Sequence, residues 1–276
     1  MDETGALDAG APSRTAMLTA TIRGWHLLVH GRDAVLGDWF GWPFVGDEAE
    51  NILAGWLSIF GDSADEFTTW VAARSRIAED WLAASAAKQY VSLGAGLDSF
   101  AWRQRSDIRV FEVDHPATQA WKRSRVAALA LPVPSSLAWV PVDFESQSLT
   151  SGLARAGLGP ASTFFSWLGV VPYLSVDALA ATLRDLPPCS LAVSYVTPPD
   201  TWEGESRRIG ERLQVVVREH GEPWLSFFSP GGFAEVLDNN GFAVIDDVGP
   251  EHVEARYGLP AINYERIALA RKSATG

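Results

Sequence analysis

The chain has 276 residues, enough for one large α/β domain that buries a sizeable core without disulfides or a structural metal. Its 22 Lys and Arg against 34 Asp and Glu give a net charge of −12 at pH 7, and so acidic a surface repels phosphate backbones and anionic lipids. This charge argues against nucleic-acid and membrane partners. The single cysteine, Cys189, excludes an internal disulfide and a multi-cysteine zinc cluster.

The lone thiol indicates a reducing environment and predicts a cytoplasmic location. The acidic start of the chain lacks the basic and then apolar order of a secretory signal. The longest apolar stretch, residues 164–174, is too short to span a bilayer.

The first third of the chain has the pattern of helices. Residues 1–14 are small, polar and acidic, and we expect a flexible tail there. From residue 15 to about 30, apolar side chains recur every three or four positions, and similar stretches cover residues 48–60 and 64–86. These stretches predict a helical cap over about residues 15–86.

After residue 86 the pattern changes to strands alternating with helices. Short apolar runs at residues 90–93, 108–113, 137–142, 163–167 and 191–196 are separated by segments long enough for a helix. This alternation predicts a doubly wound α/β fold with a mostly parallel sheet. Helices over about 175–186, 202–220 and 230–240 and strands at 242–248 and 262–270 complete about seven strands. We expect a single domain over residues 1–276, with the sheet-bearing part at about 87–276.

The first predicted strand runs into a glycine turn with the sequence LGAGLDS. Gly94 and Gly96 let a ligand approach the backbone without interference from a Cβ. Ser99 stands where a dinucleotide fingerprint has its third glycine, which argues against a nicotinamide dehydrogenase. The Gly-x-Gly pair alone also fits an ordinary strand-to-helix turn.

Acidic residues close the next two predicted strands. Asp114 lies 20 residues after Gly94, where a carboxylate can accept hydrogen bonds from the ribose hydroxyls of a nucleoside. Asp143 is followed by Phe144, which together offer an acceptor and an apolar ring to an adenine. Each acid alone also fits a solvated strand end, but features at three successive strand ends favour a nucleoside site.

The runs VSLGAGLDSFAWR, VFEVDHP, VPVDFE and FFSWLGVVPYLS resemble the leucine carboxyl methyltransferase family of S-adenosylmethionine-dependent enzymes, including its bacterial small-molecule branch. The resemblance covers about residues 13–271. It implies the Rossmann-like class I methyltransferase fold with a seven-stranded sheet and an N-terminal helical cap. It also implies a cofactor site of Arg74, Gly94, Ala95, Gly96, Asp114, His115, Asp143, Phe144, Ser166, Trp167 and Leu168.

Two positions of this implied site concern the methionine part of the cofactor. The family places an arginine near the cofactor carboxylate, which here is Arg74 or Arg76, and the upstream Ala-Arg favours Arg74. Many members have a glutamate after the fourth strand, near the methionine amino group, where this chain has Leu168. Backbone carbonyls of residues 166–168 are the alternative acceptors for that ammonium.

Methyl transfer from a sulfonium requires the protein to position a nucleophile and exclude water. A carboxylate acceptor is already ionised at neutral pH and needs no general base, and the sequence offers no convincing base. His26 and His30 are four residues apart, but no Cys, Asp or Glu near them in sequence completes a metal site, so we expect none.

These points predict an O-methyltransferase for a small hydrophobic acid of natural-product type. The alternatives are a hydroxyl or phenol acceptor on the same fold, and an inactive cofactor-binding regulatory protein. Candidate substrate residues are Tyr173, Tyr195 and Phe228. A protein tail is a weaker expectation for the substrate, although Lys122, Arg123 and Arg125 could form a basic docking patch. The oligomeric state stays open.

The chain is rich in tryptophan, with 12 residues. Six precede the sheet: Trp25, Trp39, Trp42, Trp56, Trp70 and Trp81. Their place in the predicted cap favours an aromatic-lined acceptor pocket, with a tightly packed cap as the alternative.

Overall fold

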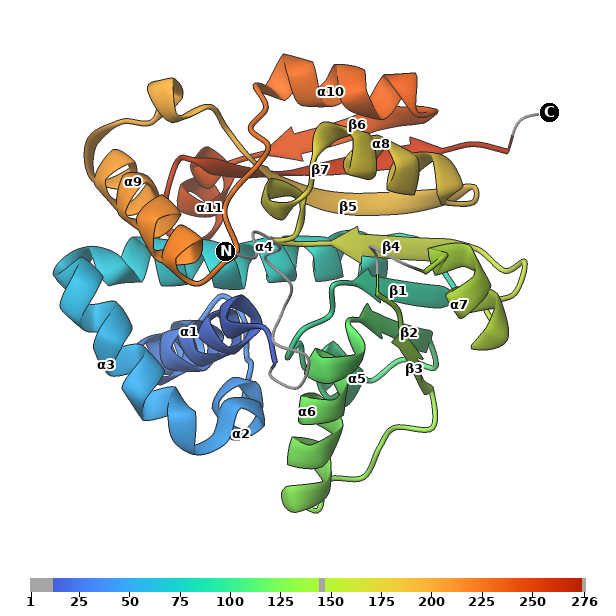
Figure 1. The fold of residues 1–276 in the computed structure, drawn as a ribbon, viewed down its shortest axis with the longest axis horizontal. Helices are drawn as coiled ribbons and strands as arrows, with labels where there is room; N and C mark the ends of the chain where they lie inside the picture. The colour runs from blue at the N-terminus through green and yellow to red at the C-terminus, as the bar shows by residue number, and fades with distance from the viewer. Residues whose placement is uncertain (1–11, 144–146, 275–276) are drawn as a thin grey trace, which may run out of the picture.

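A computed structural model describes residues 12–143 and 147–274 (Figure 1). The helices are α1 (Arg14–His30), α2 (Gly41–Val45), α3 (Ala49–Phe60), α4 (Ala64–Ala84), α5 (Phe100–Arg103), α6 (Pro116–Ala128), α7 (Leu149–Arg155), α8 (Val176–Asp185), α9 (Gly204–Glu219), α10 (Pro230–Asn239) and α11 (Pro250–Tyr257). The strands are β1 (Gln89–Leu93), β2 (Arg109–Asp114), β3 (Leu137–Pro141), β4 (Thr163–Trp167), β5 (Cys189–Val196), β6 (Phe242–Val248) and β7 (Glu265–Lys272).

The strands form one sheet in the order β3-β2-β1-β4-β5-β7-β6. Strands β1 to β5 pair in parallel, and β7 pairs antiparallel with both β5 and β6. The strand order reverses between β1 and β4, which is where open α/β sheets bind ligands at their carboxyl ends. The predicted seven-stranded, mostly parallel sheet is confirmed. Helix α11, at residues 250–257, was not predicted.

Each face of the sheet has its own hydrophobic core, because side chains alternate along the strands. On β5, Ala192 and Val196 face a core completed by α4, α9 and α11. Leu191, Val193 and Tyr195 face the other core, completed by α7, α8 and α10. Figure 1 shows the arrowheads of β1 and β4 pointing toward the side of the molecule where α1, α3 and α9 gather.

The cap is joined to the glycine turn by a buried polar network. Asp38 is 1 % exposed and accepts from Arg23 at 2.8 Å and from the Ser99 hydroxyl. Ser99 in turn accepts from Arg103, which pairs with Glu79 of α4 at 2.6 Å. The serine at the third-glycine position therefore holds cap and turn together.

The tryptophans of the cap mostly serve packing. Of the six that precede the sheet, Trp56 alone lines either of the two cavities described below, within residues 12–143 and 147–274. Trp70 is fully buried, whereas Trp39 is 71 % exposed. The prediction that these six line an acceptor pocket is therefore wrong for most of them, and the packed cap is the better description.

The structure also corrects two local expectations. Lys122 is 1 % exposed and pairs with Glu112 of β2 at 2.6 Å, so it cannot belong to a basic docking patch. Arg14 belongs to α1, and the Ser13 hydroxyl caps that helix, so the expected tail ends earlier than residue 14. The rest of the expected tail, residues 1–11, lies outside the described residues.

Within the described part of the chain, no helix combines the length and apolar character needed to cross a bilayer.

Candidate active site

The glycine turn after β1 lies at the point where the strand order reverses. Gly94 and Gly96 have φ values of 64° and 51°, which L side chains rarely adopt. A Cβ at Gly94 would lie 2.5 Å from Val170, and one at Gly96 would lie 3.1 Å from Ala16 of α1. Val170, after β4, and Ala16 of α1 therefore pack directly against this turn.

Asp114, at the end of β2, faces the same turn. Its carboxylate accepts hydrogen bonds from the backbone N–H groups of Gly96 and His115, the latter at 2.7 Å. Burial raises the pKa of Asp114, and these two backbone donors oppose that shift. A carboxylate has about four acceptor sites, so two remain for the hydroxyls of a ribose.

The neighbouring predicted residues differ in how they contribute. His115 accepts from the backbone of Ala117 at 3.3 Å and so caps α6. Asp143 is half-buried after β3. Its backbone N–H donates to the side-chain oxygen of Gln147, and its carbonyl accepts from the Gln147 backbone N–H. Phe144 lies outside the described residues.

The predicted residues of β4 turn their side chains into the protein. The Ser166 hydroxyl lies 2.7 Å from that of Tyr90, and Trp167 packs into the core beneath α7, α8 and α10. Leu168 packs against the opposite core. The expectation that this segment offers backbone groups to a ligand remains a prediction.

Arg74 and Arg76 have different surroundings. Arg76 bonds Asp80 on an exposed helix face, whereas Arg74 is 8 % exposed and binds Glu265 of β7 at 2.7 and 2.9 Å through Nη1. Trp70 donates to the same carboxylate at 2.8 Å. The Nη2 atom of Arg74 lies 2.7 Å from where a Cβ of Gly169 would be, just after β4. Arg74 thus reaches the carboxyl end of the sheet.

A small inner pocket of about 40 Å³ lies beside this ion pair. Its walls include Arg74, Gly169, Tyr173, Tyr264 and Glu265. Burial raises the pKa of Tyr173 to about 12 and that of Tyr264 well above its ordinary value, so both phenols stay protonated at neutral pH. The buried Tyr264 hydroxyl has no hydrogen-bond partner within the described residues.

Two of the three candidate substrate residues lie elsewhere. Tyr195 is buried on the α8 and α10 side of the sheet, where it stacks on Phe233 at 4.1 Å and donates to Asp247 at 2.7 Å. Phe228 packs on the same Phe233 at 5.3 Å. Alternation along β5 turns Tyr195 to this core, and Phe228, in the loop before α10, packs against the same core, so neither residue lines the inner pocket. Tyr173 does line the inner pocket.

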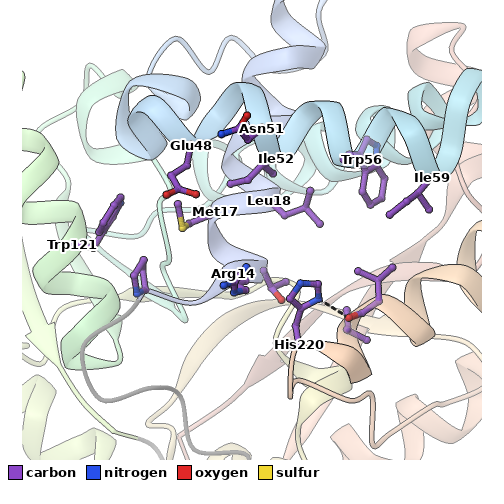
Figure 2. Close-up of a pocket in the computed structure, with 15 residues that line it drawn as sticks. Arg14, Met17, Leu18, Glu48, Asn51, Ile52, Trp56, Ile59, Trp121 and His220 are labelled. Atoms are coloured by element: carbon purple, nitrogen blue, oxygen red, sulfur yellow. Dashed lines mark hydrogen bonds between the residues drawn. The ribbon is translucent and has the colours of Figure 1, made fainter.

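A larger cavity of about 500 Å³ adjoins the inner pocket, between α1, α3 and α9 (Figure 2). Leu18, Ile52, Trp56 and Ile59 contribute much of its apolar surface, and Trp121 of α6 lies at one end. Sequence reasoning missed this cavity, and it missed Glu265, an isolated acid at the start of an apolar strand with no local signal.

A group of possible metal ligands corrects another expectation. His26, His30 and Asp65 have ligand atoms within 4.8 Å of one another, so a carboxylate does join the histidine pair. Val35 donates its N–H to His26 Nε2 at 3.1 Å, which puts the ring proton on Nδ1, and His30 Nε2 lies 3.0 Å from Asp65. His26 Nδ1 is buried without a hydrogen-bond partner within the described residues, and the His26 ring packs against that of His30 at 4.4 Å.

These three residues predict an acid-sensitive contribution to stability. Burial, with repulsion from His30, lowers the pKa of His26 from 6.5 to about 4. Between these values the unfolded chain binds the proton and the native chain does not, so stability falls as the pH drops from 6.5 toward 4. We expect wild type to lose about 2–3 kcal/mol of unfolding free energy from this group between pH 6.5 and 4.5. Urea titrations at both pH values should show a smaller loss for His26→Gln, whereas His252→Gln should match wild type. Equal losses in all three proteins would refute the assignment.

The sheet has the strand order 3-2-1-4-5-7-6, with a glycine turn and an acid where that order reverses. This is the fold of class I methyltransferases. Two solved structures share the fold at low sequence identity. The pyocyanin biosynthetic protein PhzM matches with a TM-score of 0.51 and 13% identity, over 90% of this chain and 76% of its own. Magnesium protoporphyrin IX methyltransferase from Synechocystis PCC 6803 matches with a TM-score of 0.50 and 13% identity, over 80% and 94%.

Sequence comparison identifies the family. The leucine carboxyl methyltransferase family matches residues 16–186, and the chain belongs to it. YktD of Bacillus subtilis, which bears the name of an S-adenosyl-L-methionine-dependent methyltransferase, is 34% identical over 176 residues, or 60% of this chain and 58% of YktD. A Mycobacterium avium protein with the same kind of name is 30% identical over 240 residues, or 78% and 75% of the two chains. The predicted family and its cofactor, S-adenosylmethionine, are confirmed.

Proposed function

We propose that this protein transfers the methyl group of S-adenosylmethionine to the carboxylate of a small hydrophobic acid. The observation that supports this most directly is the chemistry of the inner pocket. It presents hydrogen-bond donors that keep their protons at neutral pH, and its one described carboxylate, Glu265, already accepts three hydrogen bonds. Such a pocket suits an acceptor that is already an anion.

The residues at the strand ends fit the cofactor. The glycine turn lies where the strand order reverses, the usual place for a ligand in such sheets, and the two further acceptor sites of Asp114 suit its ribose hydroxyls. Arg74 lines the inner pocket that the acceptor's carboxylate would enter, so its expected contact with the cofactor carboxylate stays a prediction. When bound, S-adenosylmethionine supplies an electrophilic methyl carbon on a sulfonium sulfur, which the acceptor oxygen displaces in line.

The protein's own part in such a reaction is binding and orientation. Tyr264 and Tyr173 can donate to the acceptor's carboxylate and hold it in place. Neither phenol serves as a base at neutral pH, because burial keeps both protonated. A phenol or alcohol acceptor would need its proton removed, which makes these the less favoured acceptors.

The experiment is a pH profile of turnover with S-adenosylmethionine and two acceptor series, aliphatic and aromatic carboxylic acids on one side and phenols on the other. We expect methyl esters, with kcat/KM nearly constant from pH 6 to 9, because the acceptor is ionised throughout. Methylated phenols with a rate that rises with pH would favour the hydroxyl alternative. Cofactor binding without any methylated product would favour a regulatory protein.

A further inference from the structure

We propose that the outer cavity between α1, α3 and α9 binds the body of an elongated apolar acid, whose carboxylate enters the inner pocket. This proposal rests on the proposed function and names its substrate class. The two spaces are contiguous, because Thr15, Leu18 and Val217 line both. A ligand can therefore occupy the two at once.

The volumes of the two spaces suit a ligand with a small polar head in the inner pocket and an apolar body in the outer cavity. The inner pocket, at about 40 Å³, exceeds the roughly 10–15 Å³ that a cavity needs to hold one water, and so has room for a small polar head. The outer cavity, at about 500 Å³, is within the range of about 300–1,000 Å³ found for small-molecule sites. The bulk of any substrate must lie in the outer space.

The lining of the outer cavity follows one face of α3. Asn51, Ile52, Gly55 and Ile59 recur every three or four positions along this face, while the other side of the helix packs in the core. Residues 48–59 cover about 16 Å at 1.5 Å per residue, so the cavity is long. Figure 2 shows Asn51, Ile52, Trp56 and Ile59 in a row above the cavity, with Leu18 and Met17 of α1 below them. An elongated apolar body matches this shape.

Gly55 offers a direct test. A Cβ at this position would meet nothing within 4 Å, and Gly55 lines the cavity, so Gly55→Trp places a ring in the cavity without a backbone clash. Replacing a helical glycine also improves helix propensity, so the variant should fold. Ala54→Trp is the matched control, because Ala54 is exposed on the same helix and does not line the cavity.

The measurement is isothermal titration calorimetry of dodecanoate into each protein saturated with S-adenosylhomocysteine. We expect Gly55→Trp to bind dodecanoate at least tenfold more weakly than wild type, and Ala54→Trp to bind it as wild type does. Equal dodecanoate affinity in wild type and Gly55→Trp would overturn the proposal, as would failure of wild type to bind dodecanoate.

These results test the proposed substrate cavity and the proposed methyl transfer independently. Loss of dodecanoate binding in Gly55→Trp, with no methyl ester from any acid, would support the cavity and contradict the proposed function. Ester formation with dodecanoate affinity unaffected by Gly55→Trp would support the function and contradict the cavity.

Discussion

Replacing Lys122 by methionine is expected to lower the free energy of unfolding by about 3–5 kcal/mol. The Lys122 ammonium is buried 2.6 Å from Glu112 and lies 5.4 to 5.7 Å from the ring centroids of Phe44, Trp102 and Trp139. Methionine fills the aromatic site but leaves the Glu112 carboxylate buried without a counter-charge.

The stability of Lys122→Met should depend on pH. Burial already raises the pKa of Glu112 to about 7 in the wild type, against the opposing effect of Lys122. Without Lys122 the native state binds the proton still more tightly than the unfolded state. Stability of Lys122→Met should therefore fall as the pH rises above the ordinary glutamate pKa of 4.5.

Urea denaturation at pH 5.5 and pH 8, followed by tryptophan fluorescence, measures both effects. Arg123→Met is the control, because Arg123 is exposed on the same helix, and we expect it to stay within about 0.5 kcal/mol of wild type. The double variant Glu112→Leu with Lys122→Met should recover most of the lost stability, since it removes the unpaired charge. A loss in Lys122→Met no greater than in Arg123→Met would contradict this account.

The second large effect is expected in cofactor binding. Asp114→Ala should weaken the affinity for S-adenosylmethionine tenfold or more, because hydrogen bonds to a charged group contribute about 1.5–3 kcal/mol. The same change removes the acceptors for the N–H groups of Gly96 and His115, which hold the glycine turn. Both losses act in the same direction.

Calorimetric titration with S-adenosylmethionine checks this result, and two further variants refine it. Asp114→Asn keeps one acceptor oxygen and should bind with intermediate affinity. Asp107→Ala removes an exposed carboxylate just before β2 and should bind as wild type does. Unchanged affinity in Asp114→Ala, with a melting temperature near that of wild type, would remove Asp114 from the cofactor site.

Much of the fold was predictable because its signals are local. The alternation of apolar runs with helix-length segments predicted the sheet, and the first five strands lie within two or three residues of the predicted runs. The glycine turn and Asp114 were recognisable because strand ends and turns have distinct composition, and the turn brings the two together as expected. The choice of Arg74 over Arg76 rested on the upstream Ala-Arg of the family motif, and the structure buries Arg74 beside Gly169.

The wrong predictions concern contacts between segments that are distant in the sequence, or the face of the sheet to which a strand residue points. Tyr195 misses the inner pocket because neighbouring residues on a strand face opposite sides, while Val196 next to it lines that pocket. Asp65 joins His26 and His30 only because α1 and α4 pack together. Lys122 has the sequence context of a surface lysine, and only the packing of α6 on β2 buries it.

The sequence by itself determined the family, the alternation of strands with helices, and the glycine turn after the first strand, because these depend on short patterns with period two or 3.6 and on motif spacing. The tertiary structure alone decided which side chains meet at the inner pocket and the outer cavity. Arg74 and Glu265 are 191 residues apart, and the cavity walls come from α1, α3, α6 and α9. Such juxtapositions depend on packing between distant segments, and no local pattern encodes them.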